Sequence, residues 1–183
     1  MYGVELLVEE HKNILYFIDI TRKECENIIS GKELDLDLFR EFIDFGRNYA
    51  DKHHHGKEEQ ILFKLMLDKL GSTAEKLIKN GMYVEHDLGR LYMADLETAL
   101  NKYQDTKDDA YKLDIIGNMT GYGILLRRHI DKEDNIVYSY AERELNKSEL
   151  NEVDKYTMSF ENDEDNAKNR IKYISWLEKF KKI

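Results

Sequence analysis

The length, composition and charge of the chain limit both its fold and its partners. With 183 residues, of which 42% are hydrophobic and 36% charged, the chain is long enough for one soluble domain with a sizeable core. Its formal net charge of −9 opposes binding to nucleic acid or anionic lipid. The single cysteine cannot form an internal disulfide, and the amino terminus lacks the basic start and apolar run of an export signal, so we expect a cytoplasmic protein. No apolar stretch approaches the roughly 18 residues that span a bilayer, so we expect no membrane segment.

The first half of the chain predicts two long helices. There is no proline, and apolar residues recur at the three-and-four spacing of buried helix faces. The first helix is expected from about residue 4 to Ser30, where SGKELD supplies a glycine stop and an aspartate cap. The second is expected to follow it and to end at LGST, where Gly71 and Ser72 mark a turn.

Two further helices complete the predicted fold. The third is expected over residues 73–103, with a point at Gly81 in KNG where it could bend. The fourth follows the polar turn QDTKDD and ends near Asn146. Because short turns make consecutive helices antiparallel, the sequence predicts an all-α, antiparallel up-down four-helix bundle over residues 1–146.

The remaining residues, 147–183, are predicted to form a helical tail packed on the outside of the bundle. KSELNEVDKYTMSFENDED is polar with sparse apolar anchors, whereas AKNRIKYISWLEKFKKI has the pattern of a short amphipathic helix. We interpret its lysines as a solvated helix face rather than as a binding site for an acidic partner.

A ligand-like motif occurs twice in the chain. HHGKEEQILF, from His54, aligns with HIDKEDNIVY, from His129, as a histidine, three residues, a glutamate, an acid, an amide and three apolar residues. His54 and Glu58, like His129 and Glu133, are four residues apart, which places both side chains on one helix face. The repeat therefore predicts two matching contributions to one metal centre.

The other two helices each offer a histidine within an apolar stripe, His11 and His86. All six histidines of the chain fall in four short windows, one in each predicted helix. Any one of these histidines alone would be interpreted as an ordinary core or boundary residue. Two glutamates turned inward without a metal or partner would each cost several kcal/mol in desolvation, so their inward placement beside four imidazoles needs a cation and favours a metal. Mixed nitrogen and oxygen ligands suit iron or manganese, and bridging carboxylates suit a pair of ions.

The residues beside these ligands receive weaker predictions. His55 continues the polar stripe of Asp44, Asn48 and Asp51, so we expect it at the rim or in solvent and not as a ligand. His53 lies on an apolar stripe and is expected near the pocket. The acidic neighbours of the ligands are interpreted first as surface carboxylates and alternatively as groups that orient imidazoles; they are Glu10, Glu59, Glu85 and Asp134. Tyrosines, among them Tyr138, are assigned to the core without a further role.

These residues resemble the hemerythrin-like, or HHE cation-binding, family. EEHKNI, HHGKEEQILF, EHDLGR and HIDKEDNIVY are similar, in that order, to the ligand motifs of its four helices, and the resemblance covers about residues 3–145. It implies an antiparallel four-helix bundle around two non-haem iron ions, with manganese or zinc less favoured. The ligands it implies are His11, His54, Glu58, His86, His129 and Glu133, with Glu58 and Glu133 as bridges.

The chain also departs from the oxygen-carrying hemerythrins. Met82 stands where they have a second third-helix histidine, so one iron is expected to lack an imidazole. Their fourth-helix aspartate follows the histidine by five residues, whereas here Glu133 lies at four and Asp134 at five, and either acid could bridge. The ligand set is closer to the bacterial branch with four histidines and two glutamates.

The resemblance implies a function in binding small molecules. The first hypothesis is a di-iron protein that binds a small diatomic ligand, dioxygen or nitric oxide, for storage or sensing. The alternative is a di-iron enzyme that reduces nitric oxide or peroxide, or supplies iron for iron-sulfur cluster repair, and it would need an electron donor protein. A structural metal such as zinc is a third interpretation. The physiological ligand and the oligomeric state stay open.

Overall fold

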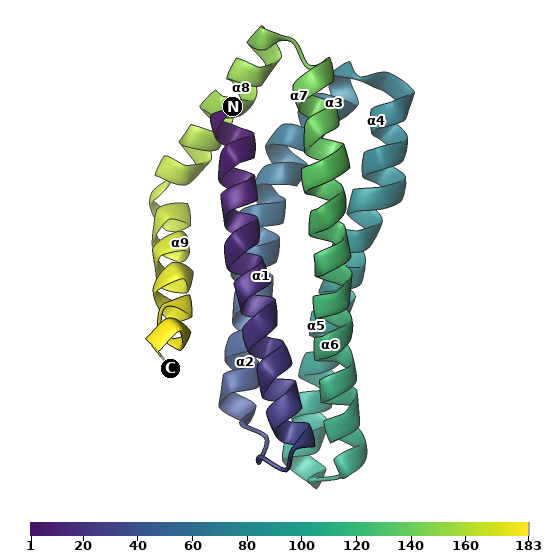
Figure 1. Cartoon of the computed structure of the whole chain (residues 1–183), viewed down its shortest axis with the longest axis vertical. Coiled ribbons are helices and arrows are strands. Elements are labelled where there is room, and N and C mark those ends of the chain that lie inside the picture. The colour runs from purple at the N-terminus through teal and green to yellow at the C-terminus, as the bar shows by residue number, and fades with distance from the viewer. Residues whose placement is uncertain (183) are drawn as a thin grey trace.

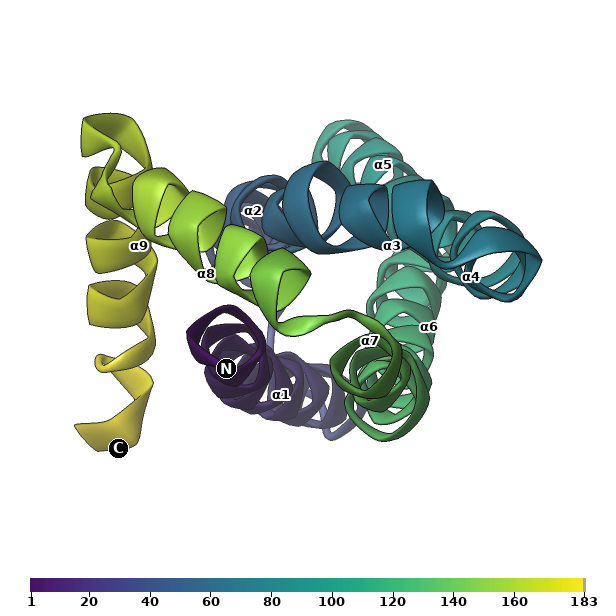
Figure 2. The ribbon, with the colours of Figure 1, turned by 90° about the horizontal axis from the view of Figure 1, so that it is seen from above.

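The computed structural model of the chain describes residues 1–182, which are mostly helical and contain no strand. Within this range four antiparallel helical arms form an up-down bundle, and a C-terminal extension lies outside it (Figure 1; Figure 2). The predicted all-α four-helix bundle with a helical extension is confirmed. Residue 183, the last of the predicted tail, lies outside the described residues. None of the helices in residues 1–182 combines the length and apolarity that a membrane span requires.

The four predicted helices correspond to the four arms, but only the first arm is an uninterrupted α-helix. The first arm is α1 (Tyr2–Ile29); the second is α2 (Leu36–Phe45), η1 (Gly46–His55), η2 (Glu58–Leu62) and α3 (Phe63–Lys69); the third is α4 (Gly71–Leu77), η3 (Ile78–Met82) and α5 (Tyr83–Thr106); the fourth is α6 (Asp109–Lys132), η4 (Glu133–Val137) and α7 (Tyr138–Glu144). The segments η1 to η4 are π-helical, with one more residue in each hydrogen-bonded turn than an α-helix. Segments η2 and η4 begin at Glu58 and Glu133, the two glutamates of the repeated motif. Single π-helical turns inside α-helices frequently occur at functional sites.

The turns between the arms use the predicted residues. The Asp35 side chain caps α2 by accepting a hydrogen bond from the backbone N–H of Leu38, and Asp108 caps α6 in the same way through Ala110. Gly71, with a φ of +65°, adopts the left-handed conformation at the turn between the second and third arms. These contacts set where each arm begins and therefore which side chains share a level in the bundle.

The bundle core consists of two apolar clusters with a polar layer between them. Along α1, His11 lies between Leu7 of one cluster and Ile14 of the other. Along the fourth arm, the histidine and glutamate of the repeat lie between Leu126 and Val137, which belong to opposite clusters. The polar side chains are thus enclosed by apolar layers on both sides, where an unpaired polar group is costly.

The C-terminal extension consists of α8 (Lys147–Asn162), α9 (Glu164–Leu177) and the 3-10 turn η5 (Phe180–Lys182). Its first half, predicted as a polar stretch with sparse anchors, is a regular helix that begins with a capping box between Asn146 and Glu149. The predicted amphipathic helix corresponds to α9, which begins three residues earlier, at Glu164, and ends at Leu177, before the last residues of the predicted stretch. The division of the chain into a bundle domain and a separate tail stays a prediction.

The extension packs closely on the first two arms. A Cβ at Gly3 of α1 would approach the side chains of Val153 and Thr157 in α8 to 3.0 Å, so the glycine permits this contact. The indole N–H of Trp176 in α9 donates to the Glu41 carboxylate at 2.7 Å. The extension is therefore held by contacts at both of its ends.

Between these ends, Glu161 of α8 joins the extension to the bundle through buried charges. Its carboxylate accepts hydrogen bonds from Lys57 of the second arm and Arg170 of α9. It also lies 3.2 Å from Nε2 of His53, and Glu10 of α1 shares the same ammonium group. Burial raises the pKa of Glu161, but the hydrogen bond from His53 and the charge of Lys57 outweigh burial and lower the pKa to about 2.

We expect acid to weaken the attachment of the extension. The pKa of Glu161 in the folded chain lies below the ordinary value of about 4.3, so its contribution to stability is complete above that pH and is lost as the pH falls toward 2. Fluorescence of Trp176, the single tryptophan, should report release of α9 in this window. The stability difference between the wild type and Glu161→Gln should shrink through the same window; a constant difference would contradict the assignment.

Candidate metal centre

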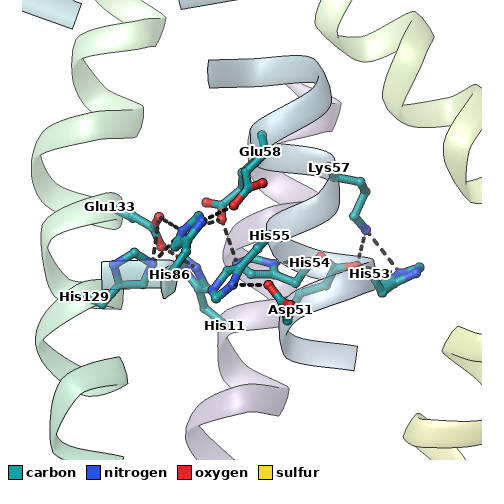
Figure 3. Close-up of polar contacts among 12 residues, drawn as sticks. His11, Asp51, His53, His54, His55, Lys57, Glu58, His86, His129 and Glu133 are labelled. Atoms are coloured by element: carbon teal, nitrogen blue, oxygen red, sulfur yellow. Dashed lines mark hydrogen bonds and ion pairs between the residues drawn. The ribbon is translucent and has the colours of Figure 1, made fainter. Parts of the chain in front are cut away.

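Seven buried side chains from the four arms converge in the polar layer. They are the six predicted residues together with one more histidine: His11, His54, His55, Glu58, His86, His129 and Glu133. Figure 3 shows their imidazole and carboxylate groups directed toward one another between the helices. Each of these residues is at most 4% exposed. The structure therefore brings all six sequence-predicted residues to one place.

The seven residues form two groups that could each hold one ion. The first group is His11, His54, Glu58 and Glu133; the second is His55, Glu58, His86 and His129. Within each group the potential ligand atoms all lie within 4.8 Å of one another. Because Glu58 belongs to both groups, the arrangement favours two neighbouring ions with a shared carboxylate.

The two carboxylates lie between the groups. Oε2 of Glu58 is 3.7 Å from Nε2 of His54 and 3.6 Å from Nε2 of His86. The two oxygens of Glu133 face different groups, with Oε2 3.3 Å from Nε2 of His11 and Oε1 3.1 Å from Nε2 of His129. Each carboxylate can therefore contact both ion positions.

Several atoms in the centre have no hydrogen-bond partner among residues 1–182. These buried atoms are Nε2 of His54, Oε2 of Glu58 and both carboxylate oxygens of Glu133. Buried polar atoms are nearly always paired, and an unpaired carboxylate oxygen is especially costly. All of them are good metal ligands, so the residues present fit a pair of bound cations.

The charges of the centre also favour a bound cation. Burial and the nearby charge of Glu133 raise the pKa of Glu58 well above its ordinary value. Burial lowers the pKa of the His129 imidazole, but the charge of Glu133 outweighs it and the pKa rises to about 9. Two carboxylates this close cannot both stay ionised without a positive charge, which metal ions would supply in place of protons.

Each of the five histidines has a carboxylate at its outer nitrogen, Nδ1. The pairs and their distances are His11–Asp134 at 2.7 Å, His54–Glu10 at 2.9 Å, His55–Asp51 at 3.3 Å, His86–Glu59 at 2.7 Å and His129–Glu85 at 2.9 Å. An ionised carboxylate only accepts hydrogen bonds, so Nδ1 carries a proton and Nε2 faces the centre, where its lone pair would serve a metal ion in place of a proton. The acidic neighbours thus orient imidazoles, although each of the four predicted candidates acts on a histidine of another arm.

His55 is a correction to the sequence prediction. It was expected at the rim, but it is 4% exposed, and its ring stacks on that of His86 with centroids 3.8 Å apart. The prediction assumed α-helical turns, whereas η1 is π-helical through His55 and changes which residues share a face. His55 also supplies an imidazole on the side where Met82 was expected to leave one missing.

The structure also separates the two adjacent acids of the fourth arm. Glu133 is fully buried in the centre, whereas Asp134 turns outward to accept the hydrogen bond from His11. Of the two alternatives for a bridging residue, Glu133 alone has its carboxylate among the converging ligand atoms.

Tyr138 is part of the centre, a role that the sequence pattern did not predict. Its hydroxyl donates to Oε1 of Glu58 and lies 3.5 Å from Nε2 of His11. In the repeat it aligns with Phe63, whose ring stacks beside His86 much as the Tyr138 ring stacks beside His11. The sequence therefore differs between the two copies at this position by one hydroxyl group, and this difference is the feature that could have indicated the role of Tyr138.

We expect Tyr138→Phe to weaken metal binding without removing it. The change keeps the ring but deletes the donor that orients Glu58, and loss of such a partner typically lowers metal affinity about 10- to 100-fold. Chelator competition would measure the effect, with Tyr83→Phe as a control, since Tyr83 is partly buried against the same apolar cluster. An affinity equal to that of the wild type would show that the hydroxyl does not hold Glu58.

A cavity of about 170 Å³ leads to one side of the centre. Its inner wall includes His55 and His86, and its outer part includes Arg90, which is paired with Asp51 and Glu59. A molecule of a few atoms could approach the second group of ligands by this route. Asp51 and Glu59 are the carboxylates at Nδ1 of His55 and His86, so Arg90 also holds the groups that orient these two histidines.

Comparison with known proteins gives one match. The family model of the hemerythrin HHE cation-binding domain matches residues 2–141. No curated protein and no solved structure matches the chain significantly. The matched range contains all seven residues of the centre and ends before the C-terminal extension.

Proposed function

The chain belongs to the hemerythrin HHE cation-binding domain family, and from this premise we propose that its centre holds two iron ions that bind dioxygen or nitric oxide for storage or sensing. The observation that carries the proposal is the convergence of five imidazoles and two carboxylates. Among their inward atoms, Nε2 of His54, Oε2 of Glu58 and both oxygens of Glu133 have no hydrogen-bond partner in the described residues. Bound iron would supply a redox-active centre with coordination positions for such a ligand.

The proposed ligands divide unequally between the two ions. His11 and His54 would hold the first ion and His55, His86 and His129 the second. Glu58 is common to both groups, and Glu133 faces each group with a different oxygen. This set has one histidine more than the four-histidine branch that the sequence resembles. The first ion would have two imidazole ligands and the second three, so we place the diatomic ligand on the side of the first.

The residues around the first ion suit a small ligand. The Tyr138 hydroxyl lies 3.5 Å from Nε2 of His11 and donates its proton to Glu58, so its oxygen can still accept a hydrogen bond on this side. The apolar clusters above and below exclude water, which strengthens each polar contact made inside.

The test is elemental analysis of protein purified without oxygen, joined to an optical spectrum before and after exposure to air and to nitric oxide. About two irons per chain and a reversible oxygen- or nitric-oxide-dependent band would support the proposal. Zinc with a silent spectrum would refute the redox function. Irreversible oxidation, or consumption of nitric oxide with an added electron donor, would replace storage or sensing by the enzymatic alternative.

A further inference from the structure

A second buried polar cluster lies on the opposite side of the second arm from the metal centre. It consists of Glu10, His53, Lys57 and Glu161, each at most 4% exposed. Figure 3 shows Lys57 and His53 directed away from the converging ligands. Lys57 donates to the carboxylates of both Glu10 and Glu161, and its Nζ lies 3.3 Å from Nε2 of His53. The ammonium group therefore fills the space between three potential ligands.

The cluster is connected to the metal centre through Glu10. One oxygen of Glu10 accepts the hydrogen bond from Lys57, and the other accepts the hydrogen bond from Nδ1 of His54 at 2.9 Å. The opposite nitrogen of His54, Nε2, is one of the inward atoms without a partner among the described residues. The position and charge of Glu10 therefore affect how His54 presents its lone pair.

The repeat contains an internal comparison for this arrangement. Lys132 occupies the place of Lys57 in the second copy and donates to Glu85, the carboxylate that orients His129. Lys132 is 43% exposed, whereas Lys57 is 1% exposed beneath α8. The extension thus adds a second carboxylate and a cover to one copy of an otherwise equivalent contact.

We propose that Glu161 of the C-terminal extension is a positioning residue for the metal centre, acting on His54 through Lys57 and Glu10. The inference rests on the proposed di-metal function and assigns to the extension control over one of the two ions. Glu161 lies beyond residues 2–141, the range matched by the family model.

The direction of the effect follows from the sharing of Lys57. With Glu161 ionised, the buried ammonium group is balanced by two carboxylates, so Glu10 keeps an oxygen free for His54. If Glu161 loses its charge, Lys57 is left with Glu10 as its carboxylate partner and draws it away from the imidazole. The ion held by His54 should then bind more weakly and with altered ligand geometry.

The experiment compares full-length wild type, Glu161→Gln and Glu152→Gln, a matched change on the exposed side of α8. Each protein is titrated without oxygen with Co²⁺, whose visible absorption depends on its ligands, and affinities are measured by chelator competition. We expect Glu161→Gln to bind one of the two ions about 10-fold more weakly, which is the low end of the loss seen when a group that orients a metal ligand is removed. The absorption band of the bound Co²⁺ should also shift. Glu152→Gln should match the wild type.

A second variant separates positioning from simple detachment of the extension. Asn169→Ala removes a hydrogen bond from α9 to the Asn48 carbonyl but leaves the contacts of Glu161 in place. Trp176 fluorescence reports attachment in every variant. The inference would be overturned if Asn169→Ala gave an equal spectral shift, or if Glu161→Gln kept the affinity and absorption of the wild type. Neither result would contradict the proposed function. Failure of the wild type to bind two ions would overturn the proposed function, and the inference with it.

Discussion

Glu58→Gln is expected to reduce the metal content from about two ions per chain to about none, because Glu58 is the residue common to both ligand groups. The substitution preserves size and leaves an oxygen that can accept the Tyr138 hydrogen bond. It removes the negative charge that both ions require. Metal content after desalting, measured by elemental analysis, tests the expectation.

The same variant should leave the metal-free protein at least as stable as the wild type. In the metal-free chain the Glu58 carboxylate is buried beside Glu133, and burial together with the charge of Glu133 raises its pKa well above the ordinary value. A neutral amide avoids this cost, so thermal unfolding of metal-free Glu58→Gln should occur at an equal or higher temperature. Loss of metal without loss of stability identifies a binding residue rather than a packing residue.

Glu75→Gln is the matched control, since Glu75 is exposed on α4 and pairs with Lys79 at the surface. It should keep both ions. Two ions retained by Glu58→Gln would show that Glu58 is not shared, whatever the behaviour of the control.

The sequence predicted the centre where helix periodicity and the repeat agreed. His54 and His129 were found because their motifs align, and His86 follows His11 by the same 75 residues by which His129 follows His54. The repeat therefore extends to the single histidines and accounts for the approximate twofold arrangement of ligands. Its helices present these residues inward because flanking apolar residues bury the same face.

The sequence did not predict features that depend on departures from the repeat or from the α-helix. His55 aligns with Ile130, so the repeat gave no indication of its role, and the π-helical turn that buries it has no simple sequence signature. The carboxylate partners were proposed by adjacency to the ligands, but adjacency along one helix does not specify the facing histidine on another. Glu161 belonged to a stretch interpreted only as polar with sparse apolar anchors, although Asn146 and Glu149 already carried the capping-box pattern of a helix.

The second large effect is expected at the histidine where the sequence and the structure disagree. His55→Gln should reduce metal content from about two ions per chain to about one, because it removes one of three imidazoles from the second group. Burial and the nearby His86 lower the pKa of His55 well below its ordinary value, so the imidazole is neutral and its Nε2 is available as a ligand while Nδ1 donates to Asp51. Elemental analysis and chelator competition would measure the loss.

His53→Gln is the matched control, since the two histidines are close neighbours in the sequence and equally buried but face different clusters. It should retain about two ions, with at most a spectral change transmitted through Lys57. If both variants retain two ions, His55 is a stacking partner of His86 rather than a ligand, and the second ion has the open position that Met82 implied. If His55→Gln alone loses an ion, the missing third-arm imidazole has been replaced from the second arm, and the diatomic ligand belongs on the side of His11 and Tyr138.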